Sequence, residues 1–274
     1  MRTYAQQLNS HLAAYKTSTL GVQEPGTFLH HGRELQYEHI LPKAKQWLNV
    51  LEPFRQDVQQ YLTDRPRIKL HRYFHHLNSS QAFALNLFFP YFESGGSAQL
   101  LQALGAQGSL SAWEPECVVD AIEGTNVDVT WVTEGARTYC EVKLSEQEFG
   151  SARDDPAHRH KLETIYRPSL AKVCAPELLE SERFFQNYQL FRHIWLAARE
   201  PESQVIFLAP RGNTKIWRQL RTFLESLAPP ISSRVRAVAV EDVLASLAVA
   251  GGLPNRLLGY AGLLSAKYLP AAAA

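Results

Sequence analysis

The chain has 274 residues, of which 45% are hydrophobic and 20% are charged. This composition is typical of a folded globular protein, so it excludes an intrinsically disordered chain and a disulfide-stapled miniprotein. The formal net charge of +1 conceals a pattern, because residues 97–150 hold nine acids and two bases whereas residues 30–76 and 151–236 are net basic.

Residues 1–17 and 34–62 carry apolar side chains at helical spacing, which predicts helices in the N-terminal part of the chain. Residues 64–76 follow as a basic and aromatic connector. Residues 81–92 are so apolar that they predict a buried helix.

The pattern changes from helical to strand spacing at about residue 110. Three strands are expected at residues 110–119, 127–132 and 138–144, and helical spacing returns over residues 159–174 and 184–198. The run at residues 204–209 predicts a buried strand, followed by a helix at 214–227, a strand at 235–240 and two closing helices.

This order predicts an α/β fold in which a mixed sheet is flanked by helices. We expect one domain over residues 1–274, made of an N-terminal helical extension (1–76), a core (77–240) and C-terminal helices (241–274).

The start of the chain is polar, and no stretch has 18 uncharged apolar residues, so we expect neither a signal peptide nor a membrane partner. The cysteines Cys117, Cys140 and Cys174 form no CxxC pair, which is typical of a reducing compartment. The expected location is therefore cytoplasmic.

The sharpest local signal is a pair of β-rich runs joined by Glu134 and Gly135, which predict a tight turn. A hairpin centred on this turn places Asp128 opposite Glu141, with Cβ atoms about 4.5–5.5 Å apart on one face. Lys143 lies two residues beyond Glu141 and therefore joins the same face.

Two carboxylates at this separation repel each other unless a cation lies between them. Mg²⁺ and Mn²⁺ prefer such hard oxygen ligands. A neighbouring lysine can orient a water, help to remove its proton, or stabilise negative charge at phosphorus. This layout suits metal-assisted hydrolysis of a phosphodiester; the alternative is a surface hairpin in which Glu141 pairs with Lys143, because the spacing is common by chance.

Asp128 at a strand start, with a Glu-Val-Lys run at residues 141–143 of the next strand, resembles the PD-(D/E)XK nuclease superfamily. The core of that superfamily is a helix, three strands, a helix and a strand, which is the order described above. Four longer blocks resemble one branch, bacterial proteins usually described as restriction endonucleases: residues 75–82, 123–128, 141–150 and 187–192. The resemblance extends over about residues 29–211.

The resemblance implies a restriction-endonuclease-like core in which Asp128 and Glu141 hold Mg²⁺ and Lys143 is the catalytic lysine. Gln189, on the helix after the strands, resembles a glutamine that supports the site in many members. One departure is His193, because many relatives carry a tyrosine four residues after that glutamine. Many relatives cut both DNA strands as dimers, so a homodimer is an open alternative.

The third acidic ligand is open at this stage. Many members place it on the first core helix, but residues 79–92 contain no acid and Glu93 comes only at the end. Glu123, at the mouth of the hairpin, is the candidate metal ligand. Gln81 and Asn86 are alternatives, for which helix capping or a core hydrogen bond is the simpler interpretation.

Contacts with the DNA backbone are expected from five basic side chains: Arg65, Arg67, Lys69, Arg72 and His160. The alternative for such a charge run is a solvated face. The histidine pairs at residues 75–76 and 158/160 suggest zinc, but no zinc-finger spacing surrounds them, which favours solvated or phosphate-contacting histidines.

The sequence therefore predicts a Mg²⁺-dependent deoxyribonuclease, in which Mn²⁺ can substitute, connected with restriction, defence or repair. The acidic middle would hold the cation and the basic flanks would contact phosphates. The first alternative is a non-catalytic module that binds nucleic acid or a partner and retains the nuclease fold. The second is a hydrolase of another phosphate ester. The presence of Asp128, Glu141 and Lys143 argues against the first alternative, since a site that has lost its catalytic activity does not require two neighbouring acids.

Overall fold

The computed structural model describes residues 2–30, 32–124 and 126–270, which divide between two compact units. The first, here called the helical unit, comprises Met1–Leu110, Pro210–Gly212 and Ala239–Ala274. The second, the sheet unit, comprises Ser111–Ala209 and Asn213–Val238. The interpretation of the chain as one domain stays a prediction.

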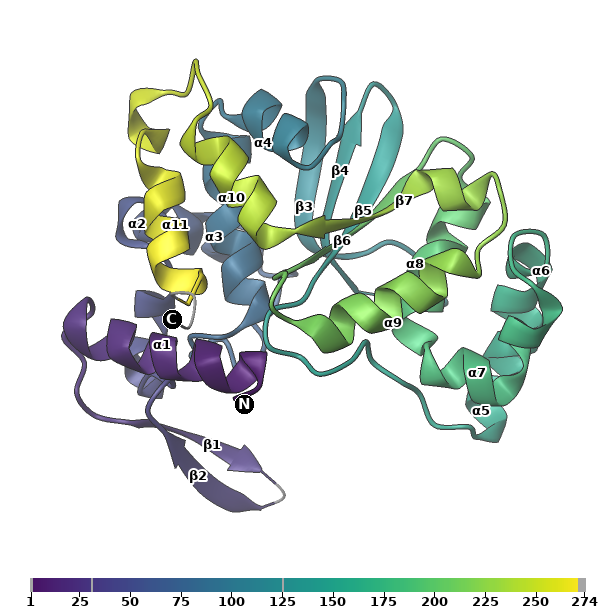
Figure 1. Cartoon of the computed structure of the whole chain (residues 1–274), viewed down its shortest axis with the longest axis horizontal. Coiled ribbons are helices and arrows are strands. Elements are labelled where there is room, and N and C mark those ends of the chain that lie inside the picture. The colour runs from purple at the N-terminus through teal and green to yellow at the C-terminus, as the bar shows by residue number, and fades with distance from the viewer. Residues whose placement is uncertain (1, 31, 125, 271–274) are drawn as a thin grey trace. The chain divides into compact units, whose positions relative to one another are not determined.

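The helical unit contains the strongly apolar helix α3 (Ser80–Glu93), in which every side chain from Gln81 to Phe92 is buried. Ser79 caps the helix by accepting a hydrogen bond from the backbone N of Ala82 at 3.3 Å. The other α-helices of this unit are α1 (Tyr4–Ser18), α2 (Arg55–Thr63), α4 (Ser97–Ala103), α10 (Val240–Ala248) and α11 (Tyr260–Tyr268) (Figure 1).

A buried polar network joins segments of the helical unit that lie far apart in the sequence. Lys267 is fully buried, and its Nζ donates to Oδ1 of Asn49 at 2.7 Å. Asn86 Nδ2 donates to the backbone O of Asn49 at 2.9 Å and to the hydroxyl of Tyr268 at 2.7 Å. The hydroxyl of Tyr260 donates to the backbone O of Asn86 at 2.8 Å. These bonds attach α11 to α3, so both ends of the chain contribute to the core of this unit.

A hairpin replaces the helical pattern expected from residue 34 onward. β1 (Gly26–His30) pairs antiparallel with β2 (Arg33–Tyr37), and α-helix begins only at α2. The expectation of one helical run over residues 34–62 is therefore wrong for its first part. Pro42 and Pro53 lack the amide hydrogen that a continuous helix requires. Two short 3₁₀ turns form before α2 instead: Lys43–Asn49, which directly follows Pro42, and Glu52–Phe54, which contains Pro53.

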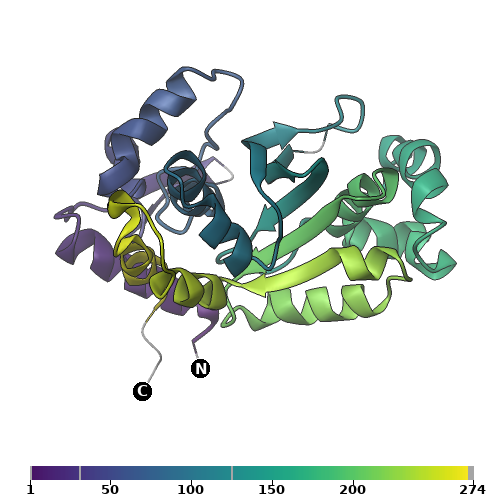
Figure 2. The same cartoon turned by 90° about the horizontal axis from the view of Figure 1, so that it is seen from above.

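The sheet unit carries five strands in the spatial order β3 (Leu110–Val118), β4 (Asn126–Thr133), β5 (Ala136–Val142), β6 (Gln204–Ala209) and β7 (Val235–Ala239). β4 and β5 are antiparallel, whereas β5 and β6 are parallel. The sheet is therefore mixed, as the order of elements predicts, and Figure 2 shows its strands from a second direction.

The helices of the sheet unit are α5 (Pro156–Lys161), α6 (Arg167–Leu170), α7 (Ser181–Gln186), α8 (Tyr188–Arg199) and α9 (Thr214–Glu225), with a π-helical turn at Leu162–Tyr166. Apolar residues of α8 and α9 share a buried cluster with Tyr139 of β5 and Phe207 of β6. Because Glu141 pairs with Phe207 in the sheet and lies on the same face as Tyr139, the face that carries Glu141 is covered by helices. Within the described residues, none of the helices has the length and hydrophobicity that crossing a membrane requires.

Candidate active site

The β4–β5 hairpin has the register that its turn predicts. Glu134 and Gly135 form the turn with positive φ angles of 49° and 87°, and the pairing beyond them follows the predicted register. Continuing this register by one step brings Asp128 opposite Glu141. The backbone N of Val142 donates to Oδ2 of Asp128 at 2.7 Å, which holds this carboxylate against the neighbouring strand.

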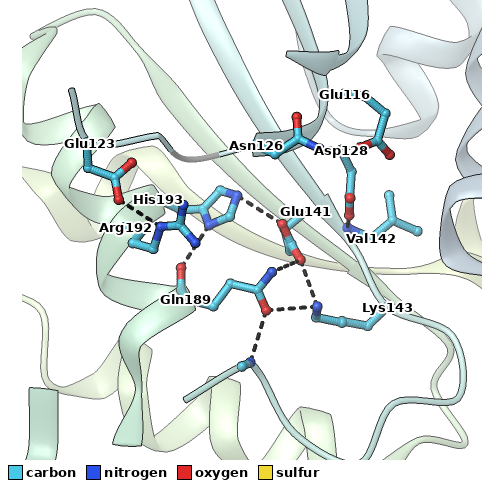
Figure 3. A network of polar contacts seen from close by, with 11 residues as sticks. Glu116, Glu123, Asn126, Asp128, Glu141, Val142, Lys143, Gln189, Arg192 and His193 are labelled. Atoms are coloured by element: carbon cyan, nitrogen blue, oxygen red, sulfur yellow. Dashed lines mark hydrogen bonds and ion pairs between the residues drawn. The ribbon is translucent and has the colours of Figure 1, made fainter. Parts of the chain in front are cut away.

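Glu141 is 1% exposed and is held from three directions. Its Oε1 lies 2.7 Å from Nζ of Lys143 and accepts a hydrogen bond from Nε2 of Gln189 at 2.6 Å. Its Oε2 lies 3.1 Å from Nε2 of His193 (Figure 3). The negative charge of Glu141 is therefore well compensated by its neighbours.

Gln189, in the first turn of α8, connects Glu141 with Lys143. Its Oε1 accepts hydrogen bonds from Nζ of Lys143 at 2.9 Å and from the backbone N of Gly150 at 3.0 Å. The backbone N of Gln189 donates in return to the O of Gly150 at 3.0 Å. Because one amide offers a donor and an acceptor, glutamine can contact an acid and a cation at once. Gln189 thus lies where the resemblance implies a supporting residue.

His193 belongs to the same network, although in the sequence it is only a departure from the family pattern. It follows Gln189 by about one helical turn and is fully buried. Its Nδ1 lies 2.9 Å from the backbone O of Gln189, and its ring packs edge-on against Phe207 with centroids 5.7 Å apart. These contacts orient Nε2 toward Glu141. The spacing of four residues from Gln189 was the signal that could have placed His193 in the site.

The two carboxylates have opposite pKa shifts. Burial raises the pKa of Asp128 well above its usual range, and the charges of Glu141 and Glu116 raise it further. Burial also acts to raise the pKa of Glu141, but Lys143 and His193 outweigh it and lower that pKa to about 2. Burial acts to lower the pKa of Lys143, but Glu141 outweighs it, so the net shift is upward. Lys143 and the backbone N of Val142 act to lower the pKa of Asp128 but do not outweigh its burial and the neighbouring acids. The site therefore combines one well-compensated carboxylate with one that is compensated only in part.

Glu123 is 2% exposed and accepts a hydrogen bond from Nε of Arg192 at 2.9 Å. It also accepts one from the hydroxyl of Tyr166, and Figure 3 shows it turned toward Arg192. In this structure the charge of Glu123 is balanced by Arg192. Contact between Glu123 and a metal ion stays a prediction.

Glu116, on β3, is an acid near Asp128 that the sequence analysis missed. It has a positive φ of 53°, and its Oε2 accepts a hydrogen bond from Nδ2 of Asn126 (Figure 3). Its charge contributes to the raised pKa of Asp128. The candidates that the sequence suggests for the third acid lie on the preceding helix and at the mouth of the β4–β5 hairpin, whereas Glu116 comes from the strand that pairs with β4 on its other side.

The carboxylate oxygens of Asp128 and Glu141 are the ligand type that Mg²⁺ and Mn²⁺ prefer. The only partly compensated charge of Asp128 is the observation that fits a bound cation. Among residues 2–30, 32–124 and 126–270, no group of three or more His, Cys, Asp or Glu side chains is arranged to hold a metal ion. The site offers the two carboxylates of Asp128 and Glu141, and Mg²⁺ can be held by one or two protein carboxylates because it keeps several waters.

The predicted DNA-contacting side chains are divided between the two units. Exposed side chains of the helical unit are Arg65, Arg67, Lys69 and Arg72, and the sheet unit contributes His160, which is exposed on α5. Their contact with DNA stays a prediction.

The other candidates named from the sequence have structural partners. His75 Nε2 lies 3.0 Å from the backbone O of Thr27, and His158 Nδ1 lies 2.9 Å from Oδ1 of Asp155. No zinc-type cluster surrounds these histidines in the part of the chain that the structure describes. Gln81 bonds to the backbone of the 64–76 connector and Asn86 to the core of the helical unit, so both have the simpler role considered for them.

Comparison with protein families matches residues 9–269 to a family described as Restriction Endonuclease associating with ARP. No curated protein and no solved structure matches the chain. The match confirms the resemblance to restriction endonucleases, and at the level of the family it supports a nuclease-type role and an interaction with DNA. Because it covers nearly the whole sequence, the chain belongs to this family of restriction endonucleases associating with ARP.

Proposed function

We propose that the protein is a Mg²⁺-dependent nuclease that hydrolyses phosphodiester bonds of DNA, with Mn²⁺ able to substitute. The observation that carries this proposal is the pairing of Asp128 with Glu141 on one hairpin, with Lys143 2.7 Å from Glu141. Family membership supports the nuclease class.

In this proposal Asp128 and Glu141 hold the metal ion, and Glu123 is the third acid that the sequence nominates. A bound Mg²⁺ would supply a Lewis acid that polarises the phosphate and lowers the pKa of a water. The raised pKa of Asp128 supports its role, because a carboxylate that is compensated only in part gains most from a neighbouring cation.

Lys143 assists the attacking water as a cation and hydrogen-bond donor. Its pKa is raised by Glu141, so at neutral pH the ammonium group is protonated and does not accept a proton. It can orient the water through a hydrogen bond and stabilise negative charge that develops on the phosphate. Gln189 supports this role, because its Oε1 accepts from Nζ of Lys143 and restricts where that group can lie.

The test is a cleavage assay with Mg²⁺ on a panel of duplex DNA, single-stranded DNA, RNA and nucleotides. Replacing Asp128, Glu141 or Lys143 by Ala should reduce DNA cleavage by roughly 10³-fold or more, since metal-assisted charge stabilisation contributes several kcal/mol. Glu148→Ala is the matched control, because Glu148 is an exposed acid close in sequence. Full Mg²⁺-dependent cleavage by the Glu141→Ala protein would overturn the proposal, and cleavage of nucleotides alone would favour another phosphate ester.

A second candidate function is a non-catalytic module that binds nucleic acid or a partner. The observation that favours it is that Lys143, Gln189 and His193 compensate the charge of Glu141. Calorimetric titration with Mn²⁺ separates the two functions. Binding that is lost in Asp128→Asn supports the nuclease, whereas no binding at millimolar Mn²⁺ supports the module.

A further inference from the structure

A cluster of aromatic and histidine rings lies in the helical unit, where the β1–β2 hairpin meets the segment 71–76. Phe28 is at its centre, with ring centroids 5.6 Å from Tyr37, 5.6 Å from Tyr73 and 5.2 Å from His76. We call the cluster the ring platform; its members are Phe28, His30, Tyr37, His39, His71, Tyr73 and His76.

The backbone holds the ring platform in place. Ile40 forms a β-bridge with His76, and the backbone N of Leu41 donates to the O of His75 at 3.0 Å. The buried amide of Gln81 accepts from the backbone N of His71 at 2.8 Å and donates to the O of Lys69 at 2.9 Å. A binding surface built this way loses little conformational entropy when a ligand arrives.

Part of the ring platform is open to solvent. Tyr37 is 42% exposed, and His30 and His71 are also exposed. Burial lowers the pKa of His39 to about 4 and that of His76 to about 3, so these imidazoles are neutral at physiological pH. They therefore offer uncharged ring surface rather than positive charge.

Positive charge is supplied by Arg72 beside Tyr73 and by basic side chains of the neighbouring segments. The guanidinium of Arg72 lies 4.4 Å from the ring centroid of Tyr73. The exposed basic side chains of β2, the following turn and the connector are Arg33, Lys43, Lys45, Arg65, Arg67, Lys69 and Arg72, and the exposed acids of the same segments are Glu34, Glu38 and Asp64. Lys45 is paired with Glu24, so the other six bases outnumber these three acids. The surface therefore combines ring faces with an excess of positive charge.

We propose that the ring platform binds a single-stranded stretch of DNA. Unpaired nucleobases would stack on Tyr37 and the neighbouring rings, while the surrounding basic side chains would contact phosphates. Base stacking on aromatic side chains beside a positively charged groove is the general mode of single-strand binding. In a duplex the base faces are stacked on each other, so only the phosphates would be available to this surface. The inference rests on the proposed nuclease function and names its substrate class, DNA that contains an unpaired segment.

The test measures binding of the full chain by fluorescence anisotropy in EDTA, where Mg²⁺-dependent cleavage cannot occur. The probes are a labelled 20-nucleotide oligo(dT) and a 20-base-pair duplex. We expect the single strand to bind more tightly. Tyr37→Ala should weaken single-strand binding by about 5- to 150-fold, the range for loss of one stacked base. Tyr37→Phe should bind like the wild type, since the ring is retained.

Leu258→Ala is the control for loss of an exposed apolar side chain of the helical unit, and it should leave binding unchanged (Leu258 is 62% exposed). Lys69→Ala and Arg72→Ala should each reduce the slope of log affinity against log salt by about 0.7, the value per phosphate contact on single strands. Thermal unfolding of each variant verifies that it is folded.

Equal binding of Tyr37→Ala and wild type to the single strand would overturn the proposal, as would a preference for the duplex. Competition by polyglutamate as effective as by unlabelled oligo(dT) would also overturn it, because the surface would then recognise charge alone. Failure of the nuclease proposal is visible separately: absence of Mg²⁺-dependent cleavage leaves these binding measurements in EDTA unaffected.

Discussion

Asp128 and Glu141 are carboxylates on the same face of one hairpin, yet their surroundings give them different roles. Glu141 is held by Lys143, Gln189 and His193, whereas the partner identified for Asp128 is the backbone N of Val142. In the proposed site Glu141 is thus prepositioned, and Asp128 supplies the charge that favours a cation. Because burial raises the pKa of Asp128, the site carries a stability cost when no cation is bound.

Asp128→Asn should make the metal-free protein more stable at pH 7 while weakening Mn²⁺ binding. The raised pKa means that the folded protein binds this proton more tightly than the unfolded chain does. The stability from this group is therefore present below its ordinary pKa and is lost as pH rises through the folded-state pKa. Asparagine removes the charge and keeps an acceptor for Val142, so we expect a gain on the order of 1–2 kcal/mol in EDTA, measured by urea unfolding.

Glu141→Gln is the matched control for this prediction, because its expected change in stability at pH 7 has the opposite sign. The pKa of Glu141 is lowered to about 2, so its contribution to stability is present above about pH 4.5 and is lost as pH falls toward 2. The Gln variant should be less stable than the wild type at pH 7, and this difference should shrink at low pH. Lower stability of Asp128→Asn than of wild type in EDTA would contradict the account of the site.

His193→Ala should weaken Mn²⁺ binding and lower kcat by about 10- to 100-fold, the usual effect of removing a side chain that orients a ligand. The physical reason is that Oε2 of Glu141 loses its partner and the carboxylate can rotate. The KM for DNA should stay unchanged. His193→Gln, which can donate from its amide, should recover part of both losses; equal defects in Ala and Gln would show that the histidine acts only through packing.

At the scale of elements, the sequence predicted the strands of the sheet unit well because each is bounded by turn residues. The β4–β5 register followed from Glu134 and Gly135 alone, since a two-residue turn leaves one pairing. The β1–β2 hairpin was missed because no element was expected over β1 and because Leu35 of β2 also fits the helical spacing of the residues that follow. Local pattern could not decide between strand and helix for β2, whereas Pro42 and Pro53 account for the 3₁₀ turns after the hairpin.

The candidate site was predicted only in part, because some of its residues come together only through tertiary packing. Asp128, Glu141 and Lys143 follow from strand alternation within one hairpin, and Gln189 came from family resemblance. His193 and Glu116 depend on how α8 and β3 lie against that hairpin, which is tertiary information. Arg192, which balances the charge of Glu123, was missed for the same reason.

Gly135→Ala should destabilise the sheet unit by about 1 kcal/mol, because a φ of 87° is unfavourable for a residue with a Cβ atom. No heavy atom lies within 4 Å of the position that the Cβ would occupy, so the effect comes from the backbone alone. Gly251→Ala, at a glycine with equally open surroundings and no positive φ, is the control and should be nearly neutral. Equal urea midpoints for the two variants would argue against the turn geometry described here.

At the scale of the whole molecule, the two units differ in how continuous their sequence segments are. The sheet unit is nearly continuous, whereas the helical unit is assembled from the beginning and the end of the described chain. The buried contact between Lys267 and Asn49 is part of that assembly. Burial lowers the pKa of Lys267 well below its ordinary value, and Arg55 adds to the effect.

Lys267→Met should flatten the pH dependence of stability between pH 7 and about 9.5. The unfolded chain binds the Lys267 proton more tightly than the folded protein, so the wild type gains stability as pH rises, by at most about 1.4 kcal/mol per pH unit. The measurement is urea unfolding across this range for both proteins. Parallel pH profiles would contradict a depressed pKa at this lysine.

The divided helical unit has a consequence for synthesis of the protein. When residue 110 leaves the ribosome, α3 has been synthesised with its run of twelve side chains that are buried in the folded protein, but α10 and α11 have not yet been synthesised. At ordinary elongation rates the ribosome needs roughly 10 to 30 s to reach Tyr268. During that interval the sheet unit can fold first, and α3 exposes apolar surface that a holdase chaperone would be expected to shield.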